Sequence, residues 1–212
     1  MLAVVDYGMG NLRSVAKALA HVAPRERIVV TSDAADIRAA ARVVLPGQSA
    51  MPGTMAGLMR SGLRDAVVEA LRERPFLGVC LGLQVLFDMS EEGPTECLGV
   101  VPGRVRRFRE ADLVTPARER LKIPHMGWNR VRQTMPHALW SGIPDGARFY
   151  FAHSYHPVPA DPAVTAGTTD YASPFTCAIA QANIFAVQFH PEKSQRAGLR
   201  LLANFVTWDP RS

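Results

Sequence analysis

The sequence predicts an α/β protein with a doubly wound, mainly parallel central sheet that is flanked by helices and extended by antiparallel β-hairpins in its second half. Through the first ninety residues, short apolar runs alternate with segments of helical periodicity, which is the pattern of βαβ units. From about residue 99 to 190, short β-like pieces are separated by Pro and Gly, which is typical of hairpins and meanders. No repeat or linker-rich segment divides the 212 residues, so we expect a single domain over residues 1–212.

The parallel strands are expected where apolar runs end in turn residues, and the helices where apolar residues recur every three or four positions. The expected strands cover residues 2–8, 27–33, 42–47 and 75–80, and the expected helices cover 11–22, 34–41, about 55–73 and 81–90. Ser32 or Asp33 is expected to cap the second helix. The hairpin strands are expected at 103–109, 123–133, 147–155, 163–171, 176–181 and 184–190, and a last helix at about 195–206.

The composition is that of an ordinary globular protein, with 48% hydrophobic and 20% charged residues. No apolar run approaches the roughly 20 residues that span a membrane, and the first ten residues lack the basic start of a signal peptide, so we expect a cytoplasmic protein. The three cysteines form no CxxC pair, which suits a reducing compartment. The net charge is +5, but a solvated strand is the commoner cause of a basic run such as its densest one, 103–110, so we expect no nucleic-acid partner.

A cysteine stands between two glycines where an expected strand meets an expected helix. The segment Gly78-Val79-Cys80-Leu81-Gly82 has the form G-x-nucleophile-x-G, in which the nucleophile occupies a sharp, strained turn and the glycines keep Cβ atoms away from it. The sulfur would then project above the carboxyl edge of the sheet, at a helix N-terminus that favours a thiolate. A lone cysteine is more often a packing residue, but the flanking glycines favour a nucleophile.

A cysteine nucleophile usually works with a base and with a group that orients the base. His190 and Glu192 stand two residues apart in "FHPE", and in an extended segment both point to the same side. The carboxylate would then fix the imidazole tautomer and leave the other ring nitrogen for the thiol. The sequence therefore predicts Cys80, His190 and Glu192 as one catalytic group.

The remaining histidines and cysteines give weaker indications of a functional site. His153 and His156 are followed by no third ligand at zinc-site spacing, so we expect no metal site. The others have no evident partner or no flanking glycines, and we expect them to be packing or surface residues: His21, His137, Cys97 and Cys177.

Together, the cysteine elbow and "FHPE" resemble the class I glutamine amidotransferase family, whose members carry a Cys-His-Glu triad on an α/β sheet. Within that family, further motifs resemble the glutaminase subunits of imidazole glycerol phosphate synthases, which belong to histidine biosynthesis. These motifs span nearly the whole chain: "DYGMGNLRSV" at 6–15, "PGQSAM" at 46–51, "GVCLGLQVLF" at 78–87, "SEEG" at 90–93, "PHMGWN" at 124–129, "YFAHSY" at 150–155 and "QFHPEKSQ" at 188–195. The elbow and "HPE" specify the superfamily, whereas "PHMGWN" and "DYGMGN" are far more specific.

The resemblance implies that L-glutamine is hydrolysed to glutamate and ammonia without a cofactor. Cys80 would attack the side-chain amide, His190 would shuttle the proton, and Glu192 would orient His190. The oxyanion hole would use the N–H of Leu81 and one from the loop that contains Gly47 and Gln48. The remaining implied roles concern the substrate: Gln84 and Glu92 would hold its α-amino end, and the backbone of His153, Ser154 and Tyr155 would seat its α-carboxylate.

One position departs from the family pattern. The family loop usually reads Pro-Gly-x-Gly, but Ser49 stands where the second glycine is expected. A non-glycine residue at positive φ costs on the order of 1 kcal/mol. Either the loop does not need positive φ here, or formation of the oxyanion hole differs.

The resemblance also implies a partner, because one glutaminase-like fold uses up the chain and no second catalytic barrel fits within it. The family precedent is a cyclase subunit with a (β/α)₈ barrel, which forms a heterodimer and uses the ammonia to make imidazole glycerol phosphate and aminoimidazole carboxamide ribotide. The implied contact positions are Asn11, Trp128, Tyr150 and Lys193, although core packing is the plainer interpretation of Trp128 and Tyr150.

Two other functions stay open at this point. The chain could be a glutaminase that serves another synthase, such as the one that makes pyridoxal phosphate, but "PHMGWN" and "DYGMGN" argue against it. It could also be an inactive regulatory protein on the same fold, which the intact Cys80, His190 and Glu192 argue against.

Overall fold

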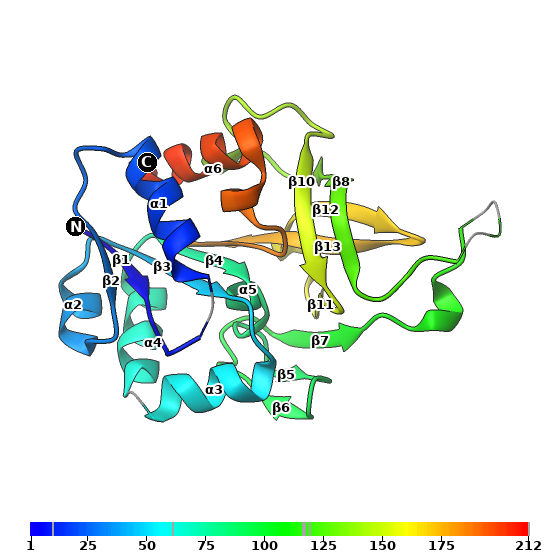
Figure 1. Ribbon diagram of the computed structural model, residues 1–212, viewed down its shortest axis with the longest axis horizontal. Helices are drawn as coiled ribbons and strands as arrows, with labels where there is room; N and C mark the ends of the chain where they lie inside the picture. Colours follow the sequence, from blue (N-terminus) through cyan, green and yellow to red (C-terminus); the bar gives the residue numbers. More distant parts are fainter. Residues whose placement is uncertain (10, 61, 116–117, 119, 212) are drawn as a thin grey trace.

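The computed structural model describes residues 1–9, 11–60, 62–115, 118 and 120–211. An eight-stranded sheet runs through its centre in the order β2-β1-β3-β4-β14-β13-β12-β9 (Figure 1). The bounds of these strands are β1 (Leu2–Val5), β2 (Ile28–Thr31), β3 (Arg42–Gly47), β4 (Phe76–Cys80), β9 (Arg132–Gln133), β12 (Thr165–Tyr171), β13 (Ser173–Gln181) and β14 (Ile184–Val187).

The strands from β2 to β14 pair in parallel, and β13, β12 and β9 extend the sheet through antiparallel pairs. Strands β1, β3, β4 and β14 are short apolar runs that are buried along nearly their whole length, as expected for a parallel sheet covered on both faces. Gly47 pairs with Cys80 in the register of β3 and β4. The loop after β3 and the elbow after β4 therefore lie side by side at the carboxyl edge.

Helices cover both faces of the sheet, as the predicted doubly wound class requires (Figure 1). Helices α1 (Leu12–Val22) and α6 (Gln195–Thr207) pack on one face, where Leu2 and Val4 of β1 point. The opposite face, where Ala3 and Val5 point, is covered by α2 (Ala34–Ala39), α3 (Met51–Arg60) and α4 (Leu63–Glu73). No helix in the described residues combines the length and apolar character that crossing a bilayer requires.

Two smaller sheets lie beside the carboxyl edge, and two of their strands, at 89–90 and 95–96, were not expected. Strands β8 (His125–Arg130) and β10 (Arg148–His153) form an antiparallel pair. A four-stranded sheet has the order β11-β7-β5-β6, with bounds β5 (Met89–Ser90), β6 (Thr95–Glu96), β7 (Gly103–Arg107) and β11 (Tyr155–Pro159). The short helical turns are α5 (Leu81–Gln84) and the 3₁₀ helices η1 (Glu110–Asp112), η2 (Ala138–Trp140), η3 (Pro162–Val164) and η4 (Pro191–Lys193).

The long helix expected at about 55–73 is wrong, because the segment forms two helices. Helix α3 begins at Met51, whose N–H donates to the Glu92 carboxylate at 2.8 Å, and it ends at Arg60. Gly62 then adopts φ +66, a left-handed conformation that breaks the helix before α4. Apolar spacing continues across this break, so the sequence pattern alone does not reveal it.

The helix expected at 81–90 is also wrong in its extent. Only the single turn α5 forms, and the chain then turns away before β5. The carbonyls of residues 85–87 accept hydrogen bonds from the backbone of residues 98–101, as in Leu98 N–H to Val85 O at 2.8 Å. Tertiary backbone partners therefore replace the next helical turn. One turn has a much smaller dipole than the expected long helix.

Strand β14 forms the expected antiparallel hairpin and, in addition, a parallel pair that was not expected. It pairs antiparallel with β13 on one side but parallel with β4 on the other. This pairing brings Val187 opposite Val79, so the "FHPE" segment emerges at the same edge as the cysteine elbow. The expected cap of the second helix is confirmed at Asp33, whose side chain accepts from the Ala35 N–H at 2.8 Å.

Candidate active site

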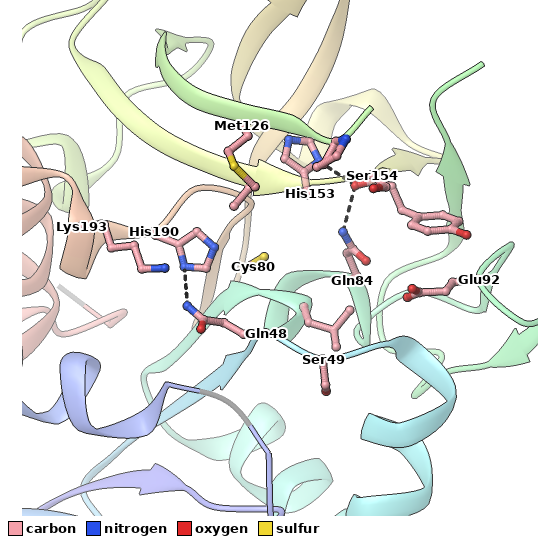
Figure 2. Close-up of a pocket in the computed structure, with 14 residues that line it drawn as sticks. Gln48, Ser49, Cys80, Gln84, Glu92, Met126, His153, Ser154, His190 and Lys193 are labelled. Carbon is pink, nitrogen blue, oxygen red and sulfur yellow. Dashed lines mark hydrogen bonds between the residues drawn. The ribbon is translucent and has the colours of Figure 1, made fainter. Parts of the chain in front are cut away.

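A pocket of about 310 Å³ opens at the carboxyl edge of the parallel strands. Cys80 lies at its centre, with His190 and Gln48 on one side and Gln84 on the other (Figure 2). Most of the residues singled out from the sequence line it: Gln48, Cys80, Leu81, Gln84, Glu92, His153, Ser154, Tyr155, His190 and Lys193. The structure therefore gathers segments from five separate parts of the chain around one sulfur atom.

The cysteine elbow has the strained geometry that the sequence predicts. Cys80 adopts φ 55 and ψ −105, which a residue with a Cβ atom rarely does. A Cβ on Gly78 would lie 2.5 Å from the Gly82 carbonyl oxygen, and a Cβ on Gly82 would lie 1.8 Å from the Leu45 carbonyl oxygen. Glycine is therefore required at both positions, because neighbouring backbone segments leave no room for a Cβ atom. This close backbone packing stabilises the turn.

His190 links the sulfur to a carboxylate. Its Nδ1 lies 2.9 Å from Glu192 Oε1, and its ring lies near enough to Cys80 for the two groups to interact electrostatically. Because Nδ1 faces Glu192, Nε2 is the nitrogen available to the thiol. Glu192 lies in the 3₁₀ helix η4 and not in the extended segment expected, yet the predicted contact forms.

The charges of this group are enclosed. The side chains of His190 and Glu192 are 2% and 1% exposed, and Glu192 Oε2 has no hydrogen-bond partner among the described residues. Burial disfavours the imidazolium, but the negative charge and hydrogen bonds of Cys80 and Glu192 outweigh it and raise the pKa of His190 to about 10. The arrangement therefore favours an imidazolium at His190, next to the Cys80 sulfur, at neutral pH.

The loop after β3 lies against the elbow. A Cβ on Gly47 would meet Leu81 Cβ at 2.5 Å and the Tyr7 hydroxyl at 2.9 Å. Gln48 reaches across the pocket, with Nε2 3.3 Å from His190 Nδ1 (Figure 2). The structure thus places both expected loop positions beside Leu81 and Cys80, where a carbonyl under attack would develop its negative charge.

The backbone of Ser49 answers whether the loop needs positive φ at the position where the family usually has glycine. Ser49 is not among the described residues with positive φ, so serine is unstrained in this conformation of the loop. Its hydroxyl lies 2.8 Å from the Thr54 hydroxyl of α3, and the Tyr7 hydroxyl donates to the Pro46 carbonyl of β3 at 3.0 Å. Ser49 therefore anchors the loop to α3 through its side chain.

The opposite wall of the pocket carries amide and carboxylate groups. Gln84 Nε2 donates to the Tyr155 carbonyl and to Gln188 Oε1, both at 2.9 Å. Glu92 lies against the first turn of α3, where its Oε2 accepts the Met51 N–H. Gln84, Glu92 and the backbone of residues 153–155 thus all line the pocket, and Gln84 contacts the 153–155 segment directly.

The four positions singled out as partner contacts fall into two places. Trp128 and Tyr150 are cross-strand neighbours in β8 and β10, with their rings edge to face at 6.1 Å, and Lys193 Nζ lies 5.8 Å from the Tyr150 ring. Trp128 is 40% exposed, so the core-packing interpretation of this residue is wrong. Asn11 caps α1 by accepting the Ser14 N–H.

The matched family covers nearly the whole chain. Residues 3–208 match the family described as glutamine amidotransferase class-I. The chain belongs to this family. Among its relatives, an imidazole glycerol phosphate synthase subunit HisH of Aromatoleum aromaticum is 59% identical over 209 residues, which is 99% of each chain. The subunit of the same name from Thiobacillus denitrificans is also 59% identical, over 99% of this chain and 92% of its own.

The fold is shared with solved structures of much lower sequence identity. A crystal structure of a glutamine amidotransferase superposes with a TM-score of 0.68 at 17% identity and covers 96% of both chains. At that identity the likeness concerns the fold alone. The mostly parallel sheet with helices on both faces is thus the fold of class I amidotransferases.

Sequence reasoning missed two residues of this class I site. Gln188 is fully buried and directs its Nε2 at Cys80 Sγ, 3.6 Å away. A polar residue within the apolar run "IFAVQFH", two positions before His190, was a usable signal. His125 lies buried in β8 and contacts His153, and only its place inside the motif "PHMGWN" marked it. Cys97 and Cys177 do not line the pocket.

Proposed function

We propose that the chain hydrolyses L-glutamine to L-glutamate and ammonia, and that it passes the ammonia to a cyclase subunit of imidazole glycerol phosphate synthase. The observation that carries the chemistry is the buried contact of Cys80, His190 and Glu192 on a strained elbow. The 59% identity to subunits that bear the synthase name supports the choice of acceptor enzyme.

In the proposed reaction, the Cys80 thiolate attacks the side-chain carbonyl carbon of glutamine. The oxyanion is stabilised by the Leu81 N–H and by an N–H of the Gly47-Gln48 loop. His190 donates its proton to the amide nitrogen, ammonia leaves, and a glutamyl thioester remains on Cys80. His190 then accepts a proton from water as the hydroxide attacks the thioester, which releases glutamate and restores the thiolate.

The substrate is proposed to span the pocket beside this group. Its α-ammonium faces Gln84 and Glu92, and its α-carboxylate faces the backbone of residues 153–155. The 310 Å³ of the pocket suits one amino acid of this size. No cofactor takes part in any step.

The partner is proposed to be a cyclase with a (β/α)₈ barrel that docks over the pocket mouth as a heterodimer. The support is the exposed pair Met126 and Trp128, at 64% and 40%, next to the cation Lys193 that lines the pocket. Exposed apolar side chains with an adjoining cation are typical of a docking surface. Free thiols at all three cysteines fit a cytoplasmic location.

The decisive experiment uses the complex co-purified with its cyclase. The Cys80→Ala variant is expected to lose synthesis driven by glutamine and to keep synthesis driven by ammonium salts, because the acceptor chemistry lies on the other subunit. Cys97→Ala is the matched control and keeps both activities, since its thiol lies outside the pocket. Glutamine-driven synthesis by Cys80→Ala would overturn the assignment. If glutamine-driven synthesis occurred only with a different synthase, that synthase would be the partner instead of the cyclase.

A further inference from the structure

Two buried histidines outside the proposed chemistry lie beside the pocket in a row of hydrogen bonds. His125 Nδ1 is 3.0 Å from His153 Nε2, and His153 Nδ1 is 2.7 Å from the Tyr155 carbonyl oxygen. At the other end, Asn129 Nδ2 is 3.2 Å from His125 Nε2. Both imidazoles are nearly inaccessible to solvent, with 3% and 6% exposure.

The donor and the acceptor of each hydrogen bond follow from the carbonyl oxygen at the end of the row. A carbonyl oxygen only accepts, so His153 Nδ1 carries a proton and its Nε2, in the neutral ring, accepts. His125 Nδ1 must then donate to His153, which leaves His125 Nε2 to accept from Asn129. Asn129 is oriented for this role, because its Oδ1 accepts the Arg130 N–H at 2.8 Å and its Nδ2 also donates to the Asp170 carbonyl at 2.7 Å.

The surroundings keep both rings neutral. His125 is stacked between Phe151 and Tyr171, with ring centroids at 4.7 and 4.1 Å. Phe108 and Phe175 each lie 5.4 Å from the His153 ring. Burial lowers the pKa of His125 to about 4, and burial followed by the neighbouring His125 lowers the pKa of His153 well below its ordinary value. In such an apolar enclosure each hydrogen bond is strong and a reversed or missing one is costly.

The row ends on an atom that orients a pocket residue. The Tyr155 carbonyl accepts from His153 and also from Gln84 Nε2 (Figure 2). Gln84 Nε2 donates its second hydrogen to Gln188 Oε1. Both amide hydrogens of Gln84 are therefore used within the protein. Its carbonyl oxygen is the atom left for a ligand, and an acceptor there suits an α-ammonium group.

We propose that Asn129, His125 and His153 are positioning residues, which hold the Tyr155 carbonyl so that Gln84 turns its side-chain oxygen toward the α-ammonium of the substrate. This inference rests on the proposed glutaminase function and adds residues that act on substrate binding and not on the chemical step. Loss of the row is expected to weaken glutamine binding while Cys80, His190 and Glu192 remain intact.

The kinetic test compares two substitutions at one position in the complex with the cyclase. Asparagine places an amide N–H where His153 Nδ1 stands, so His153→Asn keeps the bond to Tyr155, whereas His153→Leu removes it. We expect His153→Leu to raise KM for glutamine about tenfold with kcat little changed, and His153→Asn to recover most of that loss, as for one hydrogen bond. Ammonium-driven synthesis is expected to be unchanged, because the acceptor chemistry lies on the other subunit, and a kcat for glutamine close to that of the wild type reports that each variant is folded.

His156→Leu is the matched control. His156 also packs on Phe108 and Phe175, at 4.8 and 5.4 Å, but its Nδ1 faces the Pro157 carbonyl and not Tyr155. Its KM for glutamine should equal that of the wild type. Equal KM values for His153→Leu and the wild type, or a loss confined to kcat, would overturn the proposal.

A second measurement is independent of activity. In ¹⁵N NMR spectra of the whole chain at neutral pH, His125 and His153 should both appear as neutral rings protonated at Nδ1, with His153→Asn used for assignment. A ring protonated at Nε2 in either residue would refute the row. A wild-type complex that consumes no glutamine would instead refute the proposed function, because the NMR result does not depend on it.

Discussion

Cys80 shows at the scale of one residue how the fold stabilises a conformation that the backbone avoids. Positive φ at a residue with a Cβ costs on the order of 1–3 kcal/mol, and the surrounding packing must offset it. Here β3, β4 and the first turn of α5 approach so closely at Gly78 and Gly82 that no Cβ fits. The strain is thus held by the sheet core, and the sulfur is left accessible to the pocket.

The charge state of His190 is expected to depend on Cys80. Burial alone would lower the pKa of His190, and the charge and hydrogen bond of Cys80 are the largest influences that raise it to about 10. In Cys80→Ala, the pKa of His190 should fall, although Glu192 still supports the imidazolium. An NMR titration of the His190 ring measures the change, with Cys97→Ala as the control. The same pKa in both variants would mean that Glu192 alone maintains the charge.

At the scale of elements, the loop between β3 and α3 joins the site to the helical layer. Gly47 lies on the elbow, Gln48 contacts His190, and Ser49 is tied to Thr54. Glu92 reaches the N-terminus of the same helix. A shift of α3 relative to β3 would therefore move the expected oxyanion donors and one substrate contact together.

Ser49→Gly is expected to raise glutamine hydrolysis by the chain without its partner. Glycine removes the bond to Thr54 and permits positive φ at this position, so an N–H can turn toward the oxyanion more easily. Thr54→Val separates the two causes, because it removes the hydroxyl contact but adds no backbone freedom. The measurement is glutamate release by each variant. A rate no higher than that of the wild type would show that serine is compatible with the working loop.

The whole molecule is expected to be a poor glutaminase until its partner docks. Ammonia released into water becomes mostly ammonium, which is no nucleophile, so hydrolysis without an acceptor wastes glutamine. If docking completes the oxyanion hole, the rate should rise about 10²–10³-fold, the effect of one donor. The comparison is of glutamate release by the chain alone, with the cyclase, and with the cyclase plus its nucleotide ligand. Equal rates in all three would exclude such gating.

The folded chain as a whole is expected to lose stability in mild acid. Burial lowers the pKa of both His125 and His137 to about 4, below the ordinary value of 6.5. Between these values the unfolded chain binds protons that the folded chain does not, so the free energy of unfolding falls as pH falls from 6.5 toward 4. The raised pKa of His190 acts in the other direction, since its stabilisation is fully present below 6.5 and is lost as pH rises through about 10.

Urea unfolding at about pH 7 and about pH 5 measures this effect, which amounts to about 2 kcal/mol per histidine. The His137→Asn variant removes one of the two groups and keeps an acceptor for the Leu139 N–H that His137 caps. Its loss between the two pH values should be smaller by about that amount. An equal loss in variant and wild type would show that His137 does not titrate in this range.

The sequence by itself determined the features that depend only on residues close together in the chain. Apolar runs such as "LAVV" and "FLGVC" specify buried strands, glycines on both sides of Cys80 specify the elbow, and the spacing of His190 and Glu192 specifies their contact. The motif at 46–51 marked the loop that lies beside the elbow. That residues 1–212 act as one domain stays a prediction.

Only the tertiary structure decided the features that depend on partners distant in the chain. Helix α5 stops after one turn because the backbone of residues 98–101 takes the carbonyls of residues 85–87, and β14 lies parallel to β4 because it enters the sheet beside it. Gln188 meets Cys80, and His125 meets His153, across 108 and 28 residues of sequence. A local sequence pattern does not predict such pairs, because the free energy of each contact arises only when packing brings both groups out of water together.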